Sequence, residues 1–198
     1  VIRTGSEADP RGKEGVATLT ADLLDEGAGS RDALGLADQI GYLAIGLGTS
    51  AGFEQSQVGL HAARATLDSA MALMADVVLR PTFPEKEFTR LRDQWRTSLL
   101  QEQDRGPALA DRAFAALLYT EQHPYGRSTR GTTESAQAVT LDDAKAFWKA
   151  WYRPNNATLV IVGDLSFAEA QALAQRAFGG WEQAPLPPRP VYARNKMA

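Results

Sequence analysis

A short segment bounded by two glycines, Gly15 and Gly27, carries the clearest structural pattern in this chain. Its apolar residues recur at the three- and four-residue spacing of a helix that buries one face. They are Val16, Leu19, Leu23 and Leu24. A glycine at the second boundary is typical of a helix C-terminus, where the chain turns into a left-handed conformation. We therefore expect a short core helix here, around which the other elements are organised.

The rest of the chain combines helical periodicity with a few extended segments. Helices are expected over residues 31–40, 66–79, 85–103, 108–119, 141–152 and 167–178. Expected N-caps are Ser30, Thr140 with Asp143, and Asp164 with Ser166. Residues 42–50 and 53–61 flank a glycine-rich turn and predict a β-hairpin, and residues 157–162 predict the best strand. This order predicts an α+β fold with a mostly antiparallel sheet covered by helices.

Changes in composition suggest where the domain ends. Residues 1–181 are expected to form a single domain. Residues 182–198 are rich in proline, which favours an extended linker toward a second domain. The opening residues have the pattern of a strand, so we expect a fragment of a longer chain that lacks its first strands.

Composition excludes several classes of function. The net charge is −3 and the arginines are spread over several predicted helices, so we expect no nucleic-acid partner. No apolar run reaches the roughly 18 residues of a membrane span. The chain has no cysteine, which excludes disulfides and a thiol nucleophile. The two histidines, His61 and His123, fall at a predicted strand end and in a predicted turn, and we expect both to be structural.

Four segments in order carry a family resemblance. The run DPRGKEGVATLTADLLDEG resembles the start of the pitrilysin/insulinase family of zinc metallopeptidases, which includes the mitochondrial processing peptidases. The segment MADVVLRPTFPEKEFTRLRD resembles the paired helices of the family, and the break at Asp104-x-x-Pro107 follows it. The segment from His-Pro-Tyr-Gly through YRPNNATLVIVGD is the closest match. The resemblance covers residues 5–181 and implies one domain of that metallopeptidase type.

The zinc motif of the family is missing from this chain. Active members carry His-x-x-Glu-His on the first helix and a third ligand, a glutamate, on a later helix. The resemblance places the two histidines at Thr18 and Asp22, the catalytic glutamate at Ala21 and the third ligand at Ser98, with Glu102 one turn away as the alternative register. These residues cannot hold zinc or activate water. The resemblance therefore implies no catalytic residue, metal or cofactor in this domain, and zinc only in an active partner.

The family pairs zinc-bearing domains with counterparts that lack zinc. The resemblance thus implies a non-catalytic domain or subunit that completes a proteolytic chamber and helps to bind unfolded peptide beside an active zinc-bearing peptidase domain. In active relatives an edge strand accepts the peptide by β-addition. Here Leu43, Ile45, Leu47 and Thr49 would be the alternating side chains of that strand, unless the strand pairs only within its own sheet.

Two alternatives remain for the function. One is a structural or assembly subunit with no proteolytic role, as the core proteins of the cytochrome bc complex illustrate in this family. The other is a hydrolase that uses different residues, but the sequence contains no assembled pair of nucleophile and base. Bacterial relatives of this kind are often exported, which favours a periplasmic location.

Overall fold

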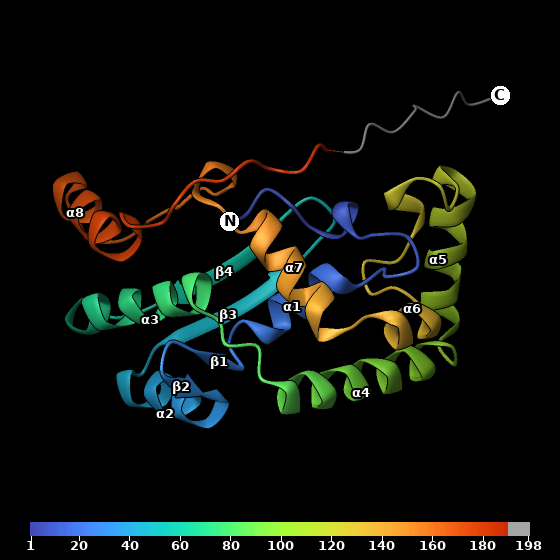
Figure 1. The fold of residues 1–198 in the computed structure, drawn as a ribbon, viewed down its shortest axis with the longest axis horizontal. Helices are drawn as coiled ribbons and strands as arrows, with labels where there is room; N and C mark the ends of the chain where they lie inside the picture. Colours follow the sequence, from blue (N-terminus) through green and yellow to red (C-terminus); the bar gives the residue numbers. More distant parts are fainter. Residues whose placement is uncertain (190–198) are drawn as a thin grey trace.

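The computed structural model describes residues 1–189 of the 198, and more than half of these are helical (Figure 1). The helices are α1 (Val16–Leu23), α2 (Ala33–Leu43), α3 (Leu67–Leu79), α4 (Glu85–Glu102), α5 (Gly106–Tyr119), α6 (Thr133–Ala138), α7 (Leu141–Trp151) and α8 (Phe167–Phe178). The strands are β1 (Gly27–Ala28), β2 (Arg31–Asp32), β3 (Gly46–Ala51) and β4 (Ser56–His61). Short 3₁₀ helices are η1 (Ser6–Ala8), η2 (Arg64–Thr66), η3 (Pro124–Gly126) and η4 (Pro154–Asn156). The strands form two antiparallel pairs, β1–β2 and β3–β4, which confirms the predicted α+β class.

Helix α1 lies at the centre of the fold. Val16, Leu19 and Leu23 are each exposed by no more than 2% and belong to the main hydrophobic core. The helix packs against α7, β3 and α4, as Figure 1 shows. The prediction of a short core helix around which the chain is organised is therefore confirmed.

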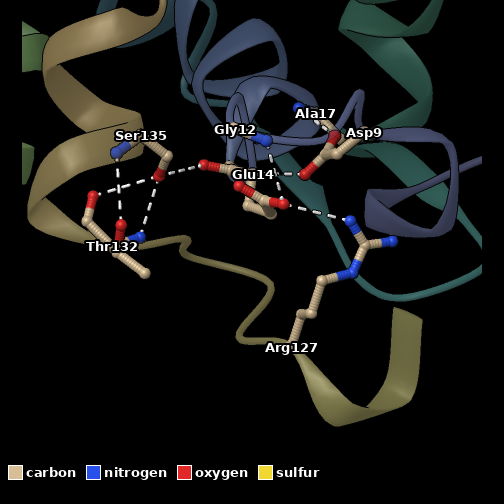
Figure 2. Close-up of polar contacts among 8 residues, drawn as sticks. Asp9, Gly12, Glu14, Ala17, Arg127, Thr132 and Ser135 are labelled. Carbon is tan, nitrogen blue, oxygen red and sulfur yellow. Dashed lines mark hydrogen bonds and ion pairs between the residues drawn. The ribbon is translucent and has the colours of Figure 1, made fainter. Parts of the chain in front are cut away.

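A buried carboxylate fixes the N-terminus of α1 (Figure 2). Asp9 is 6% exposed and accepts hydrogen bonds from the main-chain N–H groups of Gly15 (2.7 Å) and Ala17 (3.0 Å). These donors are the N–H groups that a helix N-terminus leaves without intrahelical partners. Burial raises the pKa of Asp9 to about 7, although the two N–H donors and the nearby Arg127 lower it. The side chain of Ser135 also donates to the Glu14 carbonyl (2.8 Å), so that the start of α6 is tied to this end of α1.

The hairpin lies further along the chain than its sequence pattern predicts. Residues 41–43 continue α2, and Ala44 (φ 51°) ends it in a left-handed conformation. Strand β3 therefore begins at Gly46, and the glycine-rich segment is the strand itself rather than its turn. The turn is residues 52–55, closed by a hydrogen bond from the Gly52 N–H to the Gln55 carbonyl (2.8 Å). Helix α2 is capped by the Asp32 carboxylate and not, as predicted, by Ser30.

The strand predicted at residues 157–162 is wrong for the described part of the chain. Only Ala157 forms a bridge, with Ile2, and Val1 and Thr158 exchange main-chain hydrogen bonds of 2.8 and 2.9 Å. Beyond them Val160 is 68% exposed and Val162 93% exposed. A strand needs a neighbour along its length to pair its backbone groups, and within residues 1–189 no backbone pairs with this segment beyond Thr158.

Several local predictions are confirmed at the helix ends. Thr140 and Asp143 form a reciprocal capping box at α7, and Ser166 caps α8. Asp164 does not cap α8; its carbonyl accepts a hydrogen bond from Arg64. Residues 182–189 of the predicted linker contain neither helix nor strand, and its remainder, residues 190–198, lies outside the described residues. No helix within residues 1–189 has the length and apolar character needed to cross a membrane.

Candidate functional site

A cavity of about 240 Å³ lies between α1 and α4. Its lining contains Thr18 and Asp22 from α1, Ser98 from α4 and Arg130 from the segment that precedes α6. Leu19, Leu91, Gln94 and Trp95 complete the lining. The structure thus brings together three of the four positions at which the family resemblance places the zinc machinery.

Regular helix geometry explains why these residues meet. Thr18 and Asp22 are four residues apart on α1 and so lie on one face, which is directed at α4. Ser98 lies one turn after Gln94 and Trp95 on the face of α4 that lines the same cavity. The hydroxyl of Ser98 also donates a hydrogen bond to the main-chain carbonyl of Trp95 (2.8 Å).

The fourth position, Ala21, lies outside the cavity lining. Ala21 is fully buried and belongs to the core side of α1 rather than to the cavity lining. Its methyl group has no acid–base chemistry, so it supplies no general base to activate a water molecule.

The main polar group in the cavity is a guanidinium. Arg130 donates a hydrogen bond through Nη2 to the hydroxyl of Ser98, and its Nη1 lies 3.7 Å from Oε2 of Glu102. Removal of the Asp22 carboxyl from water, together with the nearby Asp25 carboxylate, raises the pKa of Asp22 to about 6, while Arg130 lowers it. Asp22 as a residue stays exposed, so the removal from water is partial, and the protein around the carboxyl disfavours its charged form.

The donor set of this cavity does not fit zinc. Zinc sites in proteins use cysteine, histidine and carboxylate ligands that converge, normally in tetrahedral geometry. The cavity offers two hydroxyls and one carboxylate, and no cluster of three or more His, Cys, Asp or Glu in residues 1–189 could hold a metal ion. His61 ends β4, and His123 caps η3, where its Nδ1 accepts the Tyr125 N–H (3.2 Å).

The structure corrects part of the proposed edge strand. Leu43 is the last residue of α2, and Ile45, 8% exposed, precedes β3. Leu47 and Thr49 do belong to β3, but both are half-buried, and Leu47 packs against the core. The exposed face of β3 consists of Gly46, Gly48 and Ser50. The error arose because the expected helix stopped at residue 40, whereas α2 continues to Leu43, which packs on the core together with Ile40.

One edge of β3 has the geometry for strand addition. Among the described residues β3 pairs only with β4, in a register that sets Thr49 opposite Val58. In an antiparallel pair, residues that hydrogen-bond to the partner strand alternate with residues whose N–H and C=O groups point away from it. Gly52 hydrogen-bonds across the turn, so in this alternation the backbone N–H and C=O groups of Leu47 and Thr49 point away from β4. An extended peptide could pair with backbone groups directed in this way.

Sequence reasoning missed Arg130 and Trp95 as members of this site. The Trp95 indole N–H donates to the main-chain carbonyl of Arg130 (2.7 Å), a contact between residues 35 positions apart. The helical pattern placed Trp95 on the apolar face of α4. No local signal indicated that Arg130 would reach that helix, because the contact depends on how α4 and the segment before α6 pack.

Comparison with known proteins gives a consistent family match. The family model described as Insulinase (Peptidase family M16) matches residues 1–133, and the one described as Peptidase M16 inactive domain matches residues 138–196. The non-peptidase homolog YmxG of Helicobacter pylori is 27% identical over 164 residues, which cover 83% of this chain and 38% of YmxG. The zinc protease PqqE of the same bacterium is 28% identical over 188 residues, which cover 90% of this chain and 40% of PqqE.

A solved structure agrees with these sequence matches. The crystal structure of a peptidase M16 inactive domain from Pseudomonas fluorescens superposes with a TM-score of 0.88 at 28% identity, covering 94% of this chain and 45% of that chain. The present chain therefore spans less than half the length of each of these three relatives.

Proposed function

This chain belongs to the insulinase family, peptidase family M16, and we propose that it is a non-catalytic domain that holds extended peptide beside a zinc-bearing peptidase domain. The observation that carries the proposal is the cavity between α1 and α4. There Thr18, Asp22 and Ser98 stand together at positions that the resemblance assigns to zinc ligands. Two hydroxyls and one carboxylate neither retain zinc nor activate water, so hydrolysis is assigned to the partner.

An exposed apolar helix supports a partner domain. None of the residues of α5 is buried, and its exposed side chains include Phe114 (67%) and Leu117 (85%). In Figure 1 the helix stands at the end of the fold opposite α3 and α8. A group of exposed large apolar side chains is typical of a surface that another protein or domain covers. That the relatives are more than twice as long as this chain is consistent with such a neighbour.

The edge of β3 supports the peptide-holding role. Its backbone groups at Leu47 and Thr49 are directed away from β4 and suit the main-chain pairing of an extended peptide. The glycines at positions 46 and 48 leave the outer face without large side chains, so a bound peptide would meet few steric obstacles there. Affinity would then come mainly from main-chain hydrogen bonds, which suits peptides of varied sequence.

The first test measures zinc and proteolysis in one preparation. We expect zinc in the purified protein at background level by elemental analysis, and no cleavage of an unstructured reporter peptide. Addition of a zinc-bearing M16 domain should produce cleavage that a chelator abolishes. Stoichiometric zinc in this chain alone, with chelator-sensitive cleavage, would contradict the proposal.

A further inference from the structure

We propose that the guanidinium of Arg130 is a built-in cation of the α1–α4 cavity, standing where zinc-bearing members of the family hold their metal and joining the two helices in its place. The proposal starts from the mismatch described above: the cavity lacks zinc ligands yet contains a permanent positive charge. It concerns the architecture of the cavity and does not depend on the peptide-holding role.

The guanidinium of Arg130 contacts acceptors on α4 and lines the same cavity as Asp22 of α1. Its Nη2 donates to the Ser98 hydroxyl, and its Nη1 forms an ion pair with Glu102 one turn further along α4. On the α1 side, Asp22 lines the same cavity, and the Thr18 hydroxyl donates to the carbonyl of Thr129, the residue before Arg130. The guanidinium thus binds α4 directly, and the segment that carries it is bound to α1.

Glu102 shows why this charge is needed. Its side chain is 16% exposed, and its Oε2 is buried without a hydrogen bond. The guanidinium of Arg130, at 3.7 Å, is the positive charge paired with that oxygen. A buried carboxylate left without a countercharge is strongly unfavourable. The side chain of Arg130 is itself 47% exposed, so the burial in this pair lies with Glu102. Removal of Arg130 should therefore cost more stability than removal of an arginine, such as Arg96, whose acidic partner is also exposed.

The backbone that carries Arg130 is held from both helices. The Thr18 hydroxyl of α1 donates to the Thr129 carbonyl (3.0 Å), and the Trp95 indole of α4 donates to the Arg130 carbonyl (2.7 Å). The next residue, Gly131, has a φ of +68°, and a Cβ there would meet the Glu14 carbonyl oxygen at 2.0 Å. Only glycine fits this close approach, which fixes the segment against the start of α1.

A double-mutant cycle tests the charge pairing. Arg130→Met keeps the length of the side chain and removes its charge, and Glu102→Gln removes the opposing charge. We expect Arg130→Met to lower the unfolding midpoint in urea and Glu102→Gln to restore part of it in the Arg130→Met background. Arg130→Lys should retain more stability than Arg130→Met. Purely additive effects, or equal effects of Met and Lys, would overturn the proposal.

An exposed ion pair on α4, the helix that carries Glu102, provides the control. Asp93 and Arg96 are both exposed and lie 4.0 Å apart. The cycle of Arg96→Met with Asp93→Asn should be additive, since exposed ion pairs couple weakly. Coupling as large as that measured for Arg130 and Glu102 would overturn the assignment of a special role to Arg130.

Restoration of zinc ligands gives a readout independent of activity. Thr18→His, Asp22→His and Ser98→Glu together supply the ligand set of the family, and Ala21 is kept because it is not a ligand position. With Arg130 present we expect zinc well below stoichiometry by elemental analysis. With Arg130→Met added we expect about one zinc per chain, because the competing cation has gone. A full equivalent of zinc with Arg130 intact, or no zinc in either folded variant, would overturn the proposal.

Discussion

The indole ring of Trp95 occupies the space in which a Cβ on Gly15 would stand. A Cβ built on Gly15 lies 2.4 Å from Cζ2 of Trp95 and 3.0 Å from the carbonyl oxygen of Arg130. Gly15 also has a φ of +98°, a conformation that favours glycine. The start of α1, the middle of α4 and the segment before α6 therefore meet at a contact that tolerates no side chain at position 15.

We predict that Gly15→Ala destabilises the fold by about 2–4 kcal/mol, since it adds a steric clash to the cost of a positive φ. Gly12→Ala is the matched control: Gly12 also has a positive φ (+78°), but a Cβ there meets nothing within 4 Å. It should cost only about 1 kcal/mol. Urea unfolding of both variants checks this, and equal losses would show that the Trp95 contact is unimportant.

Asp9 should make stability depend on pH. Its pKa is about 7 in the folded state and 3.8 without the protein environment, so between these values the folded state binds more protons than the unfolded state. Its contribution therefore lowers stability as the pH rises through this window, by at most about 1.4 kcal/mol per pH unit, and then levels off above it.

Asp9→Asn isolates this effect. The amide has a single acceptor oxygen for the Gly15 and Ala17 N–H groups, so the variant should lose stability by about 1 kcal/mol at low pH. Its disadvantage relative to the natural chain should shrink as the pH rises from about 4 and become an advantage near pH 7, because the natural chain loses stability over this window and an amide does not ionise. Asp38→Asn on the exposed surface of α2 is the control. Parallel pH profiles for Asp9→Asn and the natural chain would refute the role of Asp9.

Thr49→Pro should weaken peptide binding at the outer edge of β3. Proline removes the N–H of Thr49 that is directed away from β4, and it preserves the ladder because Thr49 does not exchange hydrogen bonds with Val58. We expect about a tenfold rise in Kd for a fluorescein-labelled unstructured peptide, measured by anisotropy. Thr49→Val, which loses the hydroxyl but keeps the N–H, should bind as the natural chain does. Equal loss in both variants would indicate a side-chain effect instead.

Leu117→Lys should break the partner contact without harming the fold. Leu117 is 85% exposed on α5, so the unfolding free energy should change by less than about 0.5 kcal/mol. Association with a zinc-bearing M16 domain, followed by analytical ultracentrifugation, should be lost. Leu34→Lys is the matched control, because Leu34 is 70% exposed on α2 at a different surface. If Leu34→Lys disrupted association and Leu117→Lys did not, the assignment of the partner interface to α5 would be wrong.

The sequence by itself determined the features that depend on neighbours within a few residues. The apolar spacing of Val16, Leu19 and Leu23 predicts α1, because a helix forms its hydrogen bonds within one segment and shows its buried face as a local period. The capping box of Thr140 and Asp143 likewise closes over three residues. The loss of the zinc motif at Thr18 and Asp22 could also be read directly, since it concerns residue identity and not position in space.

Only the tertiary structure decided the features that join distant segments. Residues 157–162 have the composition of a strand, but a strand exists only where another backbone lies alongside, and among the described residues only Val1 and Ile2 pair with this segment, at Ala157 and Thr158. The extent of α2 moved Leu43 out of the predicted edge strand. The contact of Arg130 with Ser98, 32 residues away, appears in no local pattern. It follows from the packing of α1, α4 and the segment before α6 around Gly15. The position of the Arg130 charge in the cavity therefore depends on contacts between segments that are distant in the sequence.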